Sequence, residues 1–264
     1  MNPMTAITSD HGAGPDSLPV LVLLHAFPLD SSMWRRLVPH LQQQWNVVPL
    51  DLPGLGRSPV PDRPPSMRAV AEHVLDRLDE LGLERMTVFG VSTGGYAALQ
   101  IADLAPARCA ALVLGSTTTR IGPPDEPDDR RAHAAELERS GSTEVVAVSA
   151  REGLGATARR EQPDLEPRLG DLIARADPRG VAWMARAIAS RTDTTAVLEE
   201  FAGPVQLLFG DEDGATPPTV AAQLHAARGE GPTRLDVLGG VGHLAALEQP
   251  RRVASCLQWV RGRV

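Results

Sequence analysis

The chain has 264 residues and a hydrophobic content of 42%, which is ordinary for a globular protein with one large core. Its formal net charge of −7 argues against a general nucleic-acid-binding or anionic-membrane-binding surface. Two cysteines, Cys109 and Cys256, are too few and too far apart for a disulfide framework or a zinc motif. Residues 1–16 lack the basic and apolar regions of a signal peptide, and no apolar run approaches transmembrane length. We therefore expect a cytoplasmic location and no membrane partner.

Apolar runs alternate with helical patterns in the first half of the chain. Residues 1–19 are polar and rich in Gly and Pro, and we expect at most one edge strand there. The continuous apolar run at 20–24 predicts a strand that is covered on both faces, as in a parallel sheet. Further strands are expected at 46–50, in the run ending at Gly90, and at 110–114. Helices are expected from Ser31 or Ser32 to about Gln43 and from Ser66 to Gly82.

The alternation breaks after Gly115, because residues 120–200 carry helical stretches but no clear strand. It returns with strands expected at 205–210 and 234–238 and helices expected at 217–227 and 247–261. The whole pattern predicts an α/β fold with a mostly parallel central sheet flanked by helices. Residues 1–119 and 201–264 would form the core. We interpret residues 120–200 as a helical cap, because they leave the sheet near the carboxyl ends of strands, where ligands bind; the alternative is helices packed on the core.

The stretch Gly90-Val91-Ser92-Thr93-Gly94 fits the pattern G-x-S-x-G of a nucleophile elbow. The serine of an elbow lies on a strained strand-to-helix turn, so the residues two before and two after it must lack bulk. The following helix begins there and directs its free N–H groups at a developing oxyanion. A match of five residues arises often by chance, so a nucleophilic Ser92 requires partners elsewhere in the chain.

Those partners follow in the order that the elbow requires. A serine hydroxyl is a poor nucleophile until an oriented base takes its proton, and this kind of fold presents Ser, then Asp or Glu, then His. Asp211, Glu212 and Asp213 follow one predicted strand. We favour Asp213, which has cleared the strand end; Asp211 is the alternative, and Glu212 is expected to face solvent. His243 lies in a glycine-rich loop after the last strand and is the predicted base of a triad with Ser92.

Together these motifs resemble the α/β-hydrolase superfamily, in its branch of small, capped serine enzymes. The resemblance covers nearly all of the chain from Leu18 onward and is carried by His25-Ala26-Phe27-Pro28, Asp51 to Ser58, Gly90 to Gly94, Gly210 to Asp213 and Gly242-His243. It implies an oxyanion hole formed by the backbone N–H groups of Phe27 and Thr93, with His25 supporting the loop. Ala26 replaces the usual glycine, which predicts a slightly displaced oxyanion loop. The short N-terminal arm predicts that one or both of the family's first two strands are missing.

The resemblance implies acyl transfer, and hydrolysis of a small carboxylic ester or lactone is our first hypothesis. The segment from Arg191 to Pro204 looks like that of enol-lactonase and carboxylesterase-type members. Residues 120–200 carry 12 Arg against 16 Asp plus Glu, so they form no basic funnel, although single arginines could bind a carboxylate. The candidate apolar wall of the pocket comprises Trp183, Met184 and Ile188, which could equally be the core of the cap.

Other functions could use the same triad. They are hydrolysis of a carbon–carbon bond in a diketone, perhydrolysis, acyl transfer in biosynthesis, and slow turnover by a ligand sensor. A serine at the elbow argues against haloalkane dehalogenases and epoxide hydrolases, which resemble this fold but use an aspartate there. We expect a small-molecule substrate and neither a cofactor, a metal nor a nucleic-acid partner. The oligomeric state cannot be read from the sequence.

Overall fold

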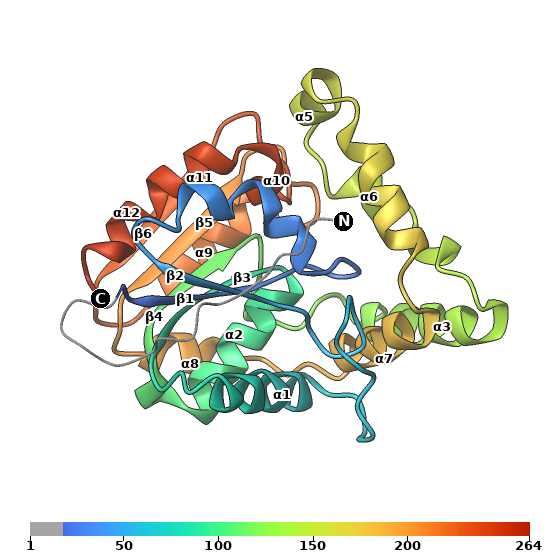
Figure 1. Ribbon diagram of the computed structural model, residues 1–264, viewed down its shortest axis with the longest axis horizontal. Coiled ribbons are helices and arrows are strands. Elements are labelled where there is room, and N and C mark those ends of the chain that lie inside the picture. Colours follow the sequence, from blue (N-terminus) through green and yellow to red (C-terminus); the bar gives the residue numbers. More distant parts are fainter. Residues whose placement is uncertain (1–17) are drawn as a thin grey trace.

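Six parallel strands form a single sheet in the order β2-β1-β3-β4-β5-β6 (Figure 1). Their bounds are Val20–Leu24 (β1), Asn46–Leu50 (β2), Met86–Val91 (β3), Cys109–Gly115 (β4), Val205–Gly210 (β5) and Thr233–Leu238 (β6). The computed structural model describes residues 18–264, so any strand expected before residue 18 lies outside the described residues. Every strand expected from residue 20 onward is present, which confirms the α/β class and the parallel central sheet.

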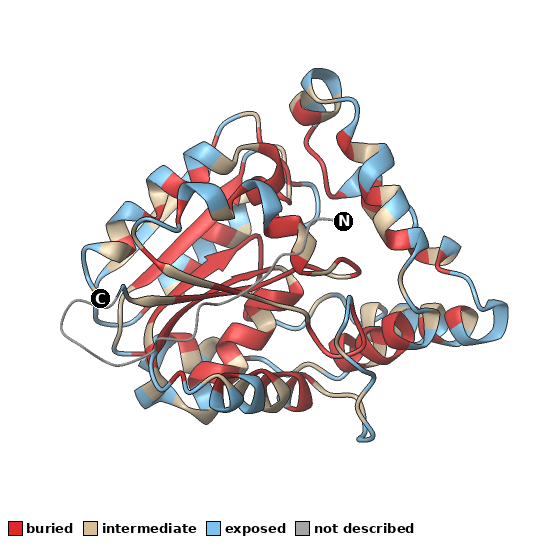
Figure 2. Cartoon of the chain, in the orientation of Figure 1, coloured by how far each residue is buried: buried red, intermediate tan, exposed pale blue. Residues whose placement is uncertain are grey.

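Continuous apolar runs form the middle of the sheet because its middle strands are covered on both faces. All six residues of β3 and of β5 are buried. The edge strands β2 and β6 keep half-exposed residues, and the contrast is visible in Figure 2. Parallel strands need crossover connections, which place helices on both faces of the sheet.

Helices cover both faces. On one face, contacts link α1 (Met67–Glu80), α2 (Thr93–Leu104), α8 (Thr195–Glu200) and α9 (Pro218–Ala227). On the other, contacts link the 3-10 helices η1 (Ser31–Arg36) and η2 (Val38–His40) to α10 (Ala245–Glu248), α11 (Pro250–Cys256) and α12 (Gln258–Arg261). A short 3-10 helix, η3 (Pro106–Arg108), precedes β4.

Two predictions of single helices are wrong, because the structure divides each of them into shorter helices. The single helix expected from residue 31 to 43 is instead the pair η1 and η2, because Asp30 caps the first of them and Pro39, which has no N–H, interrupts the helical hydrogen bonds. The helix expected at 247–261 is broken into α10, α11 and α12, and Pro250 begins the second of these.

Residues 120–200 form helices and loops and no strand, and all of them are described. Their helices are α3 (Glu126–Ser140), η4 (Glu144–Val146), α4 (Ser149–Glu152), α5 (Ala156–Glu161), α6 (Leu165–Ala174), α7 (Pro178–Ala189) and α8. Figure 1 shows α3, α6 and α7 to one side of the sheet, whereas α8 contacts α2 and α9. At the base of this segment, the Thr194 N–H donates to the Thr119 carbonyl over 2.9 Å. No helix among residues 18–264 has the length and apolar character needed to cross a bilayer.

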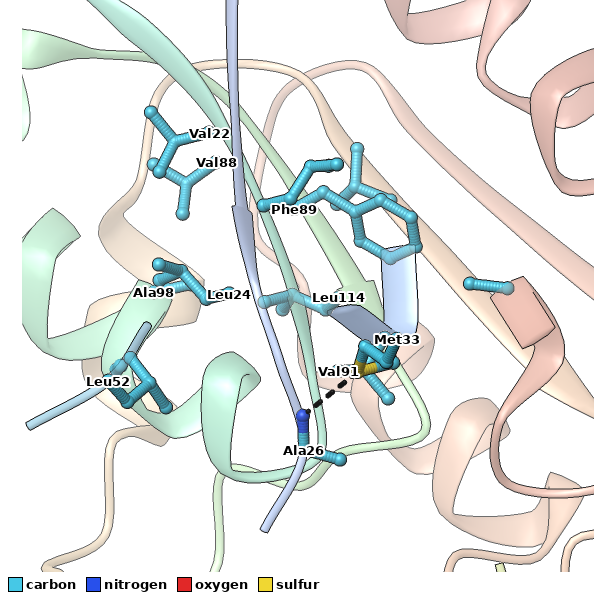
Figure 3. Close-up of a cluster of buried hydrophobic side chains, with 14 of the residues drawn as sticks. Val22, Leu24, Ala26, Met33, Leu52, Val88, Phe89, Val91, Ala98 and Leu114 are labelled. Carbon is cyan, nitrogen blue, oxygen red and sulfur yellow. Dashed lines mark hydrogen bonds between the residues drawn. The ribbon is translucent and has the colours of Figure 1, made fainter. Parts of the chain in front are cut away.

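The core beneath the carboxyl edge contains Trp34 and Phe89, whose ring centroids lie 5.1 Å apart at an interplanar angle of 58°. Both side chains are fully buried. Figure 3 shows Phe89 among aliphatic side chains from neighbouring strands, and it shows the Ala26 N–H donating to the Met33 sulfur over 3.4 Å. The loop after β1 is therefore fixed to η1 directly above this core.

Replacing Phe89 with Ala is expected to lower the free energy of unfolding by about 3 to 5 kcal/mol, since it removes a buried aromatic ring and leaves a cavity in a strand covered on both faces. Val237→Ala in the edge strand β6 is the matched control, because Val237 is 44% exposed, and it should cost about 0.5 kcal/mol. Equilibrium urea unfolding checks both values. Equal losses in the two variants would contradict this description of the core.

Candidate active site

Ser92 lies between β3 and α2 in a conformation that residues with side chains rarely adopt, with φ 54° and ψ −114°. Its flanking glycines are required by close backbone approaches. A Cβ on Gly90 would lie 2.1 Å from the Gly94 carbonyl oxygen, and a Cβ on Gly94 would lie 2.1 Å from the Leu24 carbonyl oxygen. The turn therefore has the local geometry that the G-x-S-x-G pattern predicts, with the serine at the first turn of a helix.

The loops that follow β1 and β3 flank the point where the strand order reverses, because β2 and β3 lie on opposite sides of β1. In open α/β sheets ligands bind at the carboxyl edge beside such a point. A cavity of about 510 Å³ lies there. Its lining from the core includes Phe27, Ser92, Thr93, Thr216 and His243. We refer to residues 120–200 as the helical segment. The residues that it contributes to the lining include Arg120, Ile121, Glu126, Arg130, Ser149 and Arg191.

The structure brings Asp213 and His243 together. The Nδ1 atom of His243 lies 3.0 Å from Oδ2 and 3.1 Å from Oδ1 of Asp213, which is 3% exposed. The two neighbouring acids are occupied elsewhere. Asp211 accepts the N–H groups of Gly240 and Val241, and Glu212 accepts from Thr157 in α5. Glu212, which we expected to face solvent, is partly exposed, and it also joins the loop after β5 to residue Thr157 of α5.

Burial disfavours the ionised form of Asp213 and by itself would raise the pKa of its carboxyl. The hydrogen bonds from His243 and Thr216 outweigh burial, so the pKa of Asp213 lies below its ordinary value. Asp213 is therefore ionised at neutral pH. An ionised carboxylate at Nδ1 orients the imidazole and stabilises a positive charge on it. The Nε2 atom can then accept or donate a proton.

Phe27 and Thr93, whose backbone N–H groups are the expected oxyanion hole, line the same cavity. Among residues 18–264, neither amide donates a hydrogen bond within a turn or loop that would occupy it. The fully buried His25 supports the loop that carries Phe27. The Nε2 atom of His25 accepts the Leu52 N–H over 2.9 Å, and its Nδ1 atom lies 3.0 Å from the Ala26 carbonyl oxygen. Burial lowers the pKa of His25, which keeps the ring neutral in this supporting position.

Two residues at the site were not singled out from the sequence. The Thr216 hydroxyl donates to Oδ2 of Asp213 over 2.6 Å, and its N–H donates to Oδ1 over 2.9 Å. The spacing of an Asp three residues before a Thr is a local turn signal that could have identified it. The Thr117 hydroxyl donates to the Ser92 carbonyl over 2.8 Å, and no local signal marks it, since 25 residues separate the pair.

The expected apolar wall is wrong. Trp183, Met184 and Ile188 are all buried, but none of them lines the cavity that contains Ser92. They belong to α7, which packs against α3 and α1. The Trp183 indole N–H donates to the Arg63 carbonyl over 3.1 Å, away from the site. The helical periodicity identified an apolar face correctly but not the surface that this face covers.

The cavity wall from the helical segment is charged. Arg191 forms two hydrogen bonds with Glu126, of 2.9 and 2.8 Å, and lies over the Tyr96 ring at 4.9 Å. Those bonds hold the pKa of Glu126 below its ordinary value. Arg130 lies over the Phe27 ring at 5.5 Å, and its nearest acid is Glu126 at 3.7 Å. Arg130 also contributes to the lowered pKa of Glu126, so the two arginines share this carboxylate. Among residues 18–264 no hydrogen bond engages the guanidinium of Arg120.

Comparison with known proteins identifies the class. The sequence model of the alpha/beta hydrolase fold family matches residues 19–250. Over 241 residues the chain is 26% identical to 3-oxoadipate enol-lactonase 1 of Acinetobacter baylyi, covering 90% of this chain and 87% of the relative. Over 256 residues it is 29% identical to a pimeloyl-[acyl-carrier protein] methyl ester esterase of Nitrosomonas europaea, covering 93% and 95%. A solved structure of a thermophilic esterase from Thermogutta terrifontis, with malate bound, superposes with a TM-score of 0.87 at 30% identity, covering 93% of this chain and 90% of that one. The chain belongs to the α/β-hydrolase fold family, and it is a hydrolase.

Gly94→Ala is expected to lower the free energy of unfolding by at least about 2 kcal/mol, because the new methyl group would overlap the Leu24 carbonyl and push α2 away from β1. Gly170→Ala in α6 is the matched control, since a Cβ there meets nothing within 4 Å. It should raise stability by about 0.5 to 1 kcal/mol, because alanine loses less conformational freedom in a helix. Urea unfolding of both variants measures the difference, and a Gly94→Ala protein as stable as the wild type would contradict the proposed turn geometry.

Proposed function

We propose that the protein is a serine hydrolase that cleaves a small carboxylic ester or lactone through an acyl-enzyme intermediate. The observation that carries the proposal is the hydrogen bond of 3.0 Å between His243 and the ionised Asp213, in a loop lining the same cavity as Ser92. The relatives support the choice of bond, since one is an enol-lactonase and two are esterases.

In the proposed mechanism His243 takes the hydroxyl proton of Ser92 at Nε2 while the serine oxygen attacks the substrate carbonyl. The carbonyl oxygen becomes an oxyanion that accepts hydrogen bonds from the N–H groups of Phe27 and Thr93. The bond to the leaving alcohol then breaks, and His243 gives its proton to the alcohol oxygen. Water, activated by the same imidazole, attacks the acyl-enzyme, so the acid is released and Ser92 recovers its proton. Asp213 keeps its charge throughout and stabilises the imidazolium.

Labelling with a fluorophosphonate probe tests the nucleophile directly. We expect one label, located at Ser92 by mass spectrometry, that is absent in Ser92→Ala and forms much more slowly in His243→Ala. Ser92→Ala should also reduce kcat for p-nitrophenyl acetate by about four or more powers of ten.

Ser58→Ala is the matched control, because the Ser58 hydroxyl lies 3.0 Å from Nε2 of His73 but is not part of an elbow. This variant should label like the wild type. A folded wild-type protein that takes no label would refute the proposed nucleophile.

The alternative chemistries are separated by their substrates. At equal concentrations we would compare p-nitrophenyl acetate, a γ-lactone and a vinylogous diketone. Faster cleavage of the diketone than of both esters would replace the proposed reaction with carbon–carbon bond hydrolysis. Labelling at Ser92 without turnover of any of the three would favour a slow ligand sensor or an acyltransferase that needs a second substrate.

We also propose that the acyl part of the substrate carries a carboxylate. The cavity lining holds three arginines, Arg120, Arg130 and Arg191, against Glu126 and Glu152. Glu126 is shared by Arg191, at 2.8 Å, and Arg130, at 3.7 Å, so positive charge exceeds negative charge in this part of the lining. The guanidinium of Arg130 stacks on Phe27, beside the proposed oxyanion hole. The related Thermogutta structure has malate bound, and the Acinetobacter relative is named for 3-oxoadipate. Both compounds are dicarboxylates, which supports this substrate class.

Arg130→Ala should lower kcat/KM for monomethyl glutarate about 10- to 100-fold, the value of a charge-assisted hydrogen bond, and leave methyl pentanoate within about threefold. Proton release in a pH-stat measures both rates. Arg131→Ala is the control, because Arg131 is an exposed neighbour on α3 that pairs with Asp128. Equal losses for the charged and the neutral ester in Arg130→Ala would refute the carboxylate contact and leave the proposed hydrolase intact.

A further inference from the structure

A short stretch of the helical segment, residues 153–157, runs from the end of α4 into the first turn of α5. It lies against the loops that carry Asp213 and His243. We refer to these five residues as the strap. The strap accepts a hydrogen bond from the Leu244 N–H to the Gly153 carbonyl over 3.1 Å, directly after His243. At its other end, the N–H and hydroxyl of Thr157 donate to Glu212, directly before Asp213, over 2.7 and 2.6 Å.

Glu248 in α10 joins the middle of the strap to the loop after β6 that carries His243. We refer to residues 239–244 as the histidine loop. One carboxylate oxygen, Oε2, accepts the Gly242 N–H over 2.9 Å and the Gly155 N–H over 3.3 Å. Gly242 immediately precedes His243. Glu248 is 2% exposed, and its other oxygen, Oε1, is buried with no hydrogen-bond partner among the described residues. A buried, incompletely satisfied carboxylate is costly, and burial raises the pKa of Glu248. Packing alone would be served better by an apolar side chain.

The backbones of the strap and of the histidine loop approach so closely that both need glycine. A Cβ on Gly242 would lie 2.1 Å from the Gly155 nitrogen, and a Cβ on Gly155 would lie 2.7 Å from the Gly242 nitrogen. The histidine loop itself contains Gly239, Gly240 and Gly242, and Gly240 has a φ of +70°. Glycines leave a loop many alternative conformations, so contacts from outside must select one of them.

We propose that Glu248 is a positioning residue for His243, holding the Gly242 amide against the strap so that the imidazole stays in register with Asp213 and Ser92. The inference rests on the proposed function, because it assigns His243 the role of the base. Glu248 acts through hydrogen bonds to two backbone amides and does not touch the reacting atoms. The helical segment thereby takes part in catalysis as well as in forming the cavity wall.

The expected effect follows from the geometry. A displacement of about 1 Å at a catalytic group can cost about 100-fold in rate, while the substrate-binding wall is unchanged. Glu248→Ala should therefore lower kcat for p-nitrophenyl acetate and the rate of fluorophosphonate labelling about 10- to 100-fold, with KM within about twofold. Glu248→Gln keeps an oxygen that can accept both amides and should recover most of the rate. Both measurements are made well below the melting temperature of each variant.

Glu161→Gln is the matched control, since Glu161 is an exposed glutamate at the end of α5, and it should behave as the wild type. A purely structural role for Glu248 would lower the melting temperature of Glu248→Ala without changing kcat, and that result would overturn the proposal. Equal losses in Glu248→Gln and Glu248→Ala would overturn it as well. If the wild type itself neither labels nor hydrolyses esters, it is the proposed function that fails.

Gly155→Ala tests the same coupling without altering Glu248, and it decides the question if Glu248→Ala does not fold. The added methyl group would lie 2.6 Å from Oε2 of Glu212 and 2.7 Å from the Gly242 nitrogen, so it would separate the strap from both loops. The same loss of kcat at nearly constant KM is therefore expected. Gly170→Ala, in the next helix of the segment, serves as its control. Unchanged kcat in a folded Gly155→Ala protein would contradict the proposed role of the strap.

Discussion

The backbone of Ser92 occupies a conformation that costs about 1 to 3 kcal/mol for a residue with a side chain, and the surrounding structure must supply that energy. Several contacts do so together. The Ser92 N–H donates to the Gly115 carbonyl, the Ser92 carbonyl accepts from the Gly95 N–H and the Thr117 hydroxyl, and Gly94 abuts the backbone of β1. The turn at Ser92 therefore depends on the pairing of β1, β3 and β4, and not on β3 and α2 alone.

The same dependence extends to the other functional groups. The candidate oxyanion amide of Phe27 follows β1, Ser92 follows β3, Asp213 follows β5 and His243 follows β6. Parallel strands bring these loops to one edge, although the residues are spread over more than two hundred positions of the sequence. Hydrogen bonds within a loop, such as those from Thr216 to Asp213, are joined by bonds between loops, such as that from His243 to Asp213. The four loops therefore restrain one another, and the strap adds a fifth element to this network.

The sequence predicted the parts of this arrangement that local chemistry determines. Apolar runs located the described strands, and the glycine spacing located the turn at Ser92. The position of Asp213 beyond the strand end separated it from Asp211 and Glu212. What failed depended on contacts across the fold. The periodicity of α7 identified the apolar face of Trp183 without revealing that α3 and α1 cover it. The partner of Glu212 lies 55 residues away, and the pair of Arg191 and Glu126 spans 65, so no local pattern could have predicted either contact.

The two ends of the helical segment meet, because the backbone of Thr194 is hydrogen-bonded to that of Thr119. The residues between them therefore form an insertion between β4 and β5 whose two ends lie close together. Lengthening such an insertion costs little conformational entropy. The segment between Thr119 and Thr194 can therefore be replaced by another of different length. Such a replacement would change the cavity wall and leave the strands and the loops that carry Ser92, Asp213 and His243 in place. The strap limits that freedom, because any replacement must again present two amides and a narrow glycine backbone to the histidine loop.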